Sequence, residues 1–98
     1  MKIEKPAIAG TLESSDVQIT VEPAPHLTLD ISSSVINQFG KQIKQVVTET
    51  LARLEVTSGH IIVTDKGALD CTIMARVECA VFRAAQHTGN VPWGGMVR

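Results

Sequence analysis

The stretch Ala-Ile-Ala-Gly-Thr-Leu-Glu-Ser-Ser-Asp-Val-Gln-Ile-Thr-Val, at positions 7–21, decides how this chain begins to fold. Its two halves, residues 7–12 and 17–21, have the alternating pattern of short β-strands. Between them lies the polar turn Glu13-Ser14-Ser15-Asp16, whose residue types favour a tight reversal of the chain. We therefore predict a β-hairpin that presents serine hydroxyls at its tip.

The residues that follow the hairpin continue as a strand and then change to a helical period. Residues 27–31 (Leu-Thr-Leu-Asp-Ile) alternate and predict a third strand. Ser33 or Ser34 is a candidate helix N-cap, and residues 35–54 place their apolar side chains along one side of a helix. These side chains are Val35, Ile36, Phe39, Ile43, Val46, Val47, Leu51 and Leu54.

A second strand and helix pair follows. Residues 60–64 (His-Ile-Ile-Val-Thr) are short and β-branched, so we predict a strand there, paired parallel to residues 27–31 through a right-handed crossover. Asp65-Lys66-Gly67 turns the chain, and helical spacing resumes from about residue 68 to residue 85. The predicted inner face of this helix comprises Leu69, Ile73, Val77, Ala80, Val81 and Ala84.

The predicted fold class is therefore α+β. We expect two layers, with a mixed sheet of about four strands covered on one face by two helices. We expect the 98 residues to form one domain, with an irregular tail at residues 89–98.

Composition excludes several classes of function. The net charge of −1 lacks the basic excess that nucleic-acid binding requires, and no apolar run of about 18 residues exists to span a membrane. Residues 1–6 carry no apolar signal-peptide stretch, so we expect a cytoplasmic protein. Cys71 and Cys79 lie about 12 Å apart along one predicted helix, so we expect two reduced thiols.

The sequence contains no self-contained catalytic or metal-binding pattern. His26, His60 and His87 lie in separate segments, and no Cys-x-x-Cys or Gly-x-Ser-x-Gly motif exists. A serine without a base in reach is not a nucleophile. We therefore expect no catalytic residue and no metal.

A carrier domain needs no activated group, only one exposed side chain for a modifying enzyme. Three positions offer such a side chain: Ser14 at the hairpin tip, Lys66 in the second turn, and the serines of residues 32–34. Lys66 precedes a helix, whereas lipoyl and biotinyl domains have a strand after their lysine. The serines before the long helix are better explained as caps. Ser14 and Ser15 are also compatible with ordinary turn residues.

Several segments resemble the citrate lyase acyl carrier protein (gamma chain) family, in order and at the right spacing. They are residues 6–17, Ser33-Ser34-Val35, Gln38-Phe39-Gly40, residues 65–71, residues 75–78 and Pro92-Trp93. The resemblance covers essentially the whole chain.

This resemblance implies a specific role. The first serine of Glu-Ser-x-Asp carries the family's prosthetic group, which places a 2'-(5''-phosphoribosyl)-3'-dephospho-coenzyme A arm on Ser14 through a phosphodiester. The thiol of the arm is expected to hold acetyl and citryl groups as thioesters. The implied partners are the alpha subunit (acyl transferase), the beta subunit (citryl lyase) and a prosthetic-group transferase. Together the subunits would cleave citrate to acetate and oxaloacetate.

Two other functions stay open at this stage, as does the docking surface. The chain can instead be an unmodified structural adaptor of a multi-enzyme complex, or a small enzyme that uses Ser14 with a distant histidine. An apolar strip of Cys71, Ala75 and Phe82 is a candidate surface for docking the larger subunits. Alternatively, the tail that contains Trp93 covers this strip.

Overall fold

Four strands and two helices make up the computed structural model, which describes residues 1–33 and 40–85. The strands are β1 (Ala7–Gly10), β2 (Val17–Glu22), β3 (Leu27–Ser33) and β4 (Gly59–Asp65), and the helices are α1 (Gly40–Arg53) and α2 (Asp70–Ala84). The sheet order is β1-β2-β4-β3. β1 and β4 both pair antiparallel with β2, whereas β3 runs parallel to β4.

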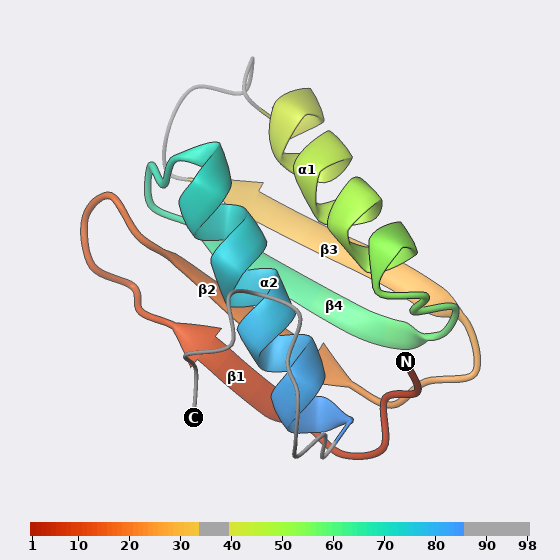
Figure 1. Ribbon diagram of the computed structural model, residues 1–98. Coiled ribbons are helices and arrows are strands. Elements are labelled where there is room, and N and C mark those ends of the chain that lie inside the picture. The colour runs from red at the N-terminus through yellow and green to blue at the C-terminus, as the bar shows by residue number, and fades with distance from the viewer. Residues whose placement is uncertain (34–39, 86–98) are drawn as a thin grey trace.

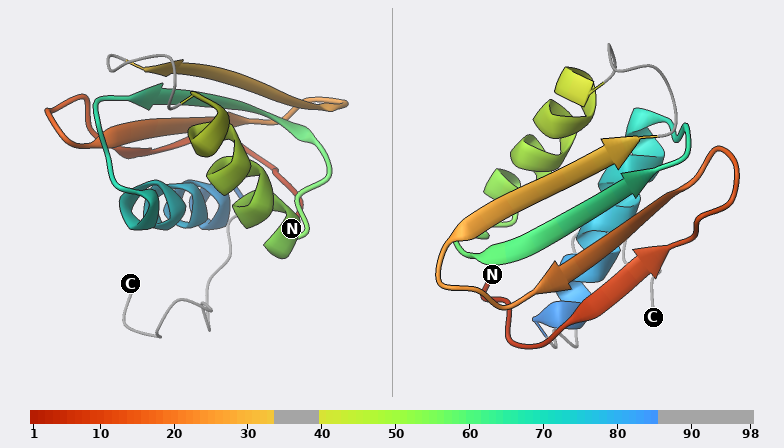
Figure 2. Two further views of the ribbon diagram at one scale, coloured as in Figure 1. Left: turned by 90° about the horizontal axis from the view of Figure 1, so that it is seen from above. Right: turned by 180° about the vertical axis from the view of Figure 1, so that it is seen from behind.

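The prediction of an α+β fold with a mixed four-stranded sheet is confirmed. Both helices cover one face of the sheet and leave the other face open, as Figures 1 and 2 show. Period-two alternation explains the arrangement, because every second residue of β2 and β4 points into the core. Fully buried side chains from β2, β4, α1 and α2 meet there: Val17, Ile19, Val21, Val47, Leu51, Ile61, Val63, Ile73, Val77 and Val81.

Ser14, Lys66 and the described serines of the third candidate, Ser32 and Ser33, all lie at one end of the sheet. β2 begins at this end, and β3 and β4 both finish there, with Val17 and Ser33 each paired to Asp65. The hairpin tip that contains Ser14 therefore projects beside the β4–α2 turn that contains Lys66 (Figure 1). Topology alone brings these separate segments together.

The first strand is shorter than predicted. β1 ends at Gly10 instead of residue 12, so Thr11 and Leu12 belong to the tip. Gly10 has a φ of 89°, which ends the extended conformation, and Leu12 is 54% exposed. The apolar character of Leu12 therefore misled the prediction.

Three expectations about the helices need correction. Ser33 ends β3, where its hydroxyl donates to Asp65, and the rest of the proposed cap and helix start, residues 34–39, lies outside the described residues. Leu69 is 71% exposed instead of facing inward, because it is the extended residue before α2 begins. Phe82 is buried, whereas Cys71 and Ala75 are exposed, so these residues do not form one docking strip. The tail with Trp93 also lies outside the described residues.

The sequence also led to expectations about the cysteine thiols, membrane-spanning helices and metal sites. Cys71 and Cys79 are both free thiols, as predicted. Within residues 1–33 and 40–85, no helix combines the length and apolar character needed to cross a bilayer. No group of three or more His, Cys, Asp or Glu side chains in this part of the chain is placed to hold a metal ion.

Candidate functional site

The hairpin tip is a closed four-residue turn with Ser14 at its second position. The Asp16 N–H donates to the Glu13 carbonyl at 3.1 Å, so Ser14 and Ser15 are the central residues. Ser15 has a φ of 65°, in the left-handed region that a non-glycine residue enters at some cost. The contacts around the turn hold this conformation in place.

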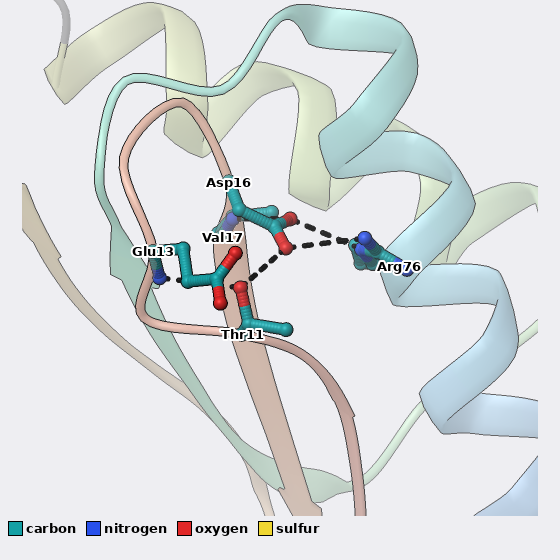
Figure 3. A network of polar contacts seen from close by, with 5 residues as sticks. All are labelled: Thr11, Glu13, Asp16, Val17 and Arg76. Carbon is teal, nitrogen blue, oxygen red and sulfur yellow. Dashed lines mark hydrogen bonds and ion pairs between the residues drawn. The ribbon is translucent and has the colours of Figure 1, made fainter.

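The Asp16 carboxylate organises the tip (Figure 3). One oxygen accepts the Thr11 hydroxyl at 2.6 Å, and the other accepts the Val17 N–H at 2.7 Å. The guanidinium of Arg76, on α2, donates to both oxygens at 3.1 Å. A bidentate arginine contact is geometrically specific, so it fixes the tip against the helix layer.

These contacts also set the charge of the tip. The Thr11 hydroxyl bond, followed by those from Val17 and Arg76, lowers the pKa of Asp16 to about 2, against burial, which raises it. Asp16 is therefore ionised at neutral pH and its charge is offset by Arg76. The exposed Glu13 donates its N–H to the Thr11 hydroxyl oxygen at 3.2 Å, which closes the network.

Backbone bonds join the tip to the β4–α2 turn. The Ser15 N–H donates to the Lys66 carbonyl, and the Lys66 N–H donates to the Asp16 carbonyl, both at 2.8 Å. At the base of the tip, a side chain on Gly10 would lie 1.8 Å from the Val17 carbonyl oxygen. Only glycine permits this approach, so the two strands can close directly beneath the turn.

Ser14 itself is exposed on this braced turn. Its hydroxyl makes no hydrogen bond to the residues that the structure describes. No base among these residues is therefore bonded to the hydroxyl to activate it. The hydroxyl is nevertheless open to an external enzyme.

Sequence reasoning missed Arg76 as a residue of this site. Arg76 lies 60 positions from Asp16, and the sequence around either residue does not predict that they pair. The available signal was the presence of opposite charges in two segments that both resemble one family, at residues 6–17 and 75–78.

An exposed hydroxyl on a braced turn of a small domain is the arrangement that a carrier protein would offer to a modifying enzyme. Comparison with known proteins agrees. Residues 4–84 match the family described as malonate decarboxylase delta subunit. The chain is 56% identical over 90 residues to a citrate lyase acyl carrier protein of Haemophilus influenzae, covering 92% of this chain and 95% of the relative.

A second relative and a solved structure extend this result. A citrate lyase acyl carrier protein of Pectobacterium carotovorum is 62% identical over 85 residues, covering 86% of this chain and 88% of the relative. A chain of a Pseudomonas malonate decarboxylase hetero-tetramer, solved with malonate, shares the fold with a TM-score of 0.69 at 22% identity. That match covers 86% of this chain and 92% of the other. The chain belongs to the citrate lyase acyl carrier protein family and is a carrier subunit without catalytic activity of its own.

Proposed function

We propose that this chain is the acyl carrier subunit of a citrate lyase, with 2'-(5''-phosphoribosyl)-3'-dephospho-coenzyme A attached to Ser14 by a phosphodiester. The observation that carries the proposal is the exposed Ser14 hydroxyl on a turn braced by Asp16 and Arg76. When attached, the group would supply a terminal thiol that holds acetyl and citryl groups.

The residues of the tip fit a phosphodiester at Ser14. Modification displaces no hydrogen bond of the Ser14 side chain among the described residues. The carboxylate of Asp16, two residues after Ser14, is already paired with Arg76, which limits its repulsion of a new negative charge. Lys66 is joined to the tip through its backbone and adds a basic residue beside Ser15. Glu13 is exposed, so water and salt screen its charge.

The role of the chain is to present the arm. Because Ser14 lacks a base, the activating group would come from the prosthetic-group transferase. A rigid body that docks alternately on the alpha and beta subunits would hold the tethered acyl group at high effective concentration near each active site. The proposed net reaction of the assembly is cleavage of citrate to acetate and oxaloacetate.

The test is the intact mass of the protein purified from its own host grown on citrate. We expect added mass equal to the prosthetic group, located by peptide mapping at the tip. Ser14→Ala should remove the addition, whereas the matched variant Ser15→Ala should keep it. If the added mass persists in Ser14→Ala, the group is attached to a residue other than Ser14. An unmodified mass under these conditions would overturn the proposal and favour the structural adaptor.

A further inference from the structure

A pocket of about 590 Å³ lies at the same end of the molecule as the hairpin tip. Its lining residues come from the first turns of α1 and α2 and from the end of β4 with the turn that follows it. Figure 1 shows that the described starts of both helices and the ends of β3 and β4 lie at this end of the molecule. Crevices outside the carboxyl ends of parallel strands are frequent ligand sites, and this volume suits a small organic group. Sequence reasoning did not predict this pocket.

Its walls are mainly apolar. Ile43 and Ile73 are buried side chains that reach the pocket from α1 and α2. Ala68 and Leu69 line it from the turn between β4 and α2, and Leu69 is 71% exposed. An apolar group placed in the pocket would shield Leu69 from water, which is favourable.

The polar groups of the pocket select against an anion. Asp65 is 2% exposed, and its carboxylate accepts the Ser33 hydroxyl at 2.9 Å and the Ala68 N–H at 3.0 Å. At the rim, the Gln42 amide donates to both oxygens of Asp70, at 3.2 and 2.9 Å. Two carboxylates would repel a phosphate. They can still accept hydrogen bonds from the N–H groups of a neutral amide.

A short path connects Ser14 to the pocket. Lys66 exchanges backbone hydrogen bonds with Ser15 and Asp16, and the next residue, Gly67, already lines the pocket. An arm that leaves Ser14 therefore passes the basic Lys66 before it reaches the apolar walls. This order of charges matches a group that is anionic near its attachment point and neutral toward its thiol.

We propose that this pocket is the resting site for the neutral, thiol-bearing end of the arm on Ser14, and this inference rests on the proposed function. The charged nucleotide part stays outside, on the Lys66 side, because Asp65 and Asp70 line the pocket. The docked end packs against the side chains of Leu69, Ile43 and Ile73. Burial there would protect a thioester from water between transfers.

A native cysteine can report on the docked thiol. Cys71 lines the pocket and is exposed, whereas Cys79 is half-buried two turns further along α2 and does not line it. The modified protein, with its acyl group removed, would be treated with diamide at low protein concentration. The oxidant takes up two hydrogen atoms as the arm thiol and a cysteine thiol form a disulfide. We expect the disulfide at Cys71, retained in Cys79→Ser and lost in Cys71→Ser.

A pair of matched variants separates docking from random collision. Leu69→Glu adds a charge to the pocket wall, whereas Met74→Glu places the same charge on an exposed α2 residue that does not line the pocket. We expect about tenfold slower trapping in Leu69→Glu, because part of the apolar contact is lost, and little change in Met74→Glu. Rates would be normalised to the reaction of Cys71 with a small thiol reagent in each unmodified variant.

NMR spectra of the modified and unmodified protein supply a second measurement. Docking should shift the methyl signals of Ile43, Ala68 and Ile73, beyond the changes near Ser14. Equal trapping at Cys71 and Cys79, together with shifts confined to the tip, would overturn the pocket inference. The added mass in that same sample would leave the proposed function standing, whereas its absence would overturn both.

Discussion

The two ends of the sheet each carry a cluster of carboxylate and cation, yet the clusters are built differently. At the tip end, Asp16 pairs with Arg76, whose charge is permanent, and the Asp16 side chain is only 14% exposed. At the opposite end, His60 lies 2.5 Å from Asp30 and 3.5 Å from Glu22, with the Asp30 side chain 65% exposed. The Asp16–Arg76 cluster keeps its charges at neutral pH, whereas the charge of the other cluster changes when His60 gains or loses a proton.

The clusters also join different parts of the fold. The Asp16–Arg76 pair links the hairpin tip to α2 across the core layer (Figure 3). His60, Glu22 and Asp30 connect only neighbouring strands. They alternate with the inward-facing residues of their strands, so they belong to the sheet face away from the helices, which Figure 2 shows from behind. The comparison teaches that the polar cluster at the Ser14 end joins the hairpin to the helix layer, whereas the cluster at the far end joins only neighbouring strands. Substitutions at both ends test this difference.

The largest loss of stability is expected from substituting two glycines, one at each end of the sheet. Gly10 and Gly59 both have positive φ, at 89° and 139°. A side chain at Gly10 would lie 1.8 Å from a backbone oxygen, whereas at Gly59 the nearest atoms lie at 3.2 and 3.3 Å. We expect Gly10→Ala to lower the free energy of unfolding by on the order of 2–4 kcal/mol, and Gly59→Ala by about half as much. Urea denaturation would measure both.

The ranking of the two variants is the informative result. The clash at Gly10 involves the backbone of Val17, which cannot move without opening the hairpin. At Gly59 one of the close atoms belongs to the Ile3 side chain, which can shift by a few tenths of an ångström. Equal losses of stability would show that positive φ alone governs both sites, and that the close approach under the tip is not essential.

The second effect concerns the brace itself. Asp16→Ala removes the acceptor of the Thr11, Val17 and Arg76 donors, so we expect a loss of about 2 kcal/mol. Arg76→Met keeps the apolar stem and should cost about 1 kcal/mol. Both variants should speed hydrogen exchange of the Ser15 and Val17 amides. Unchanged exchange in Arg76→Met would show that α2 does not brace the tip.

The same brace predicts an acid response. The pKa of Asp16 is lowered in the fold from 3.8 to about 2. The folded state therefore favours the ionised carboxylate, and this stabilisation is present above pH 3.8 and lost as the pH falls toward about 2. The difference in unfolding free energy between the wild type and Asp16→Asn should shrink over that window.

The fold was largely predictable because its signals are local. The alternation of residues 17–21, the short β-branched run at residues 60–64 and the helical period of residues 68–85 identified elements that the structure contains. The ends of elements were less predictable. β1 stops at Gly10 because the tip contacts take over there, and Leu69 is exposed because α2 begins one residue later. These ends depend on contacts between distant segments.

The candidate site was predictable only in part. A polar turn between two strands indicates an exposed serine, and Ser14 is exposed. The pairing of Asp16 with Arg76 needs the packing of α2 against the hairpin, which one sequence does not reveal. The pocket needs the meeting of Gln42 and Asp70 from two helices, so it too becomes visible only in three dimensions.

The smallest expected effect lies at the far end of the sheet. The hydrogen bond to Asp30, followed by the charges of Asp30 and Glu22, raises the pKa of His60 above 6.5, against burial, which lowers it. Folding therefore favours the protonated ring. Its contribution to stability is full below pH 6.5 and is lost as the pH rises through the folded pKa. Because the cluster is exposed, the change in stability should be small.

Comparing the wild type with His60→Gln isolates this effect, since the two proteins differ only at that position. Urea midpoints measured at about pH 5.5 and about pH 9, on either side of the His60 titration, should converge between the two proteins at the higher pH. NMR titration of the His60 ring should place its pKa above 6.5, and Asp30→Asn should bring it down. A ring pKa at or below 6.5 would mean that the far end holds no charge pair. Modification of Ser14 should be unaffected by His60→Gln, because the tip is braced through Arg76 and not through the open face of the sheet.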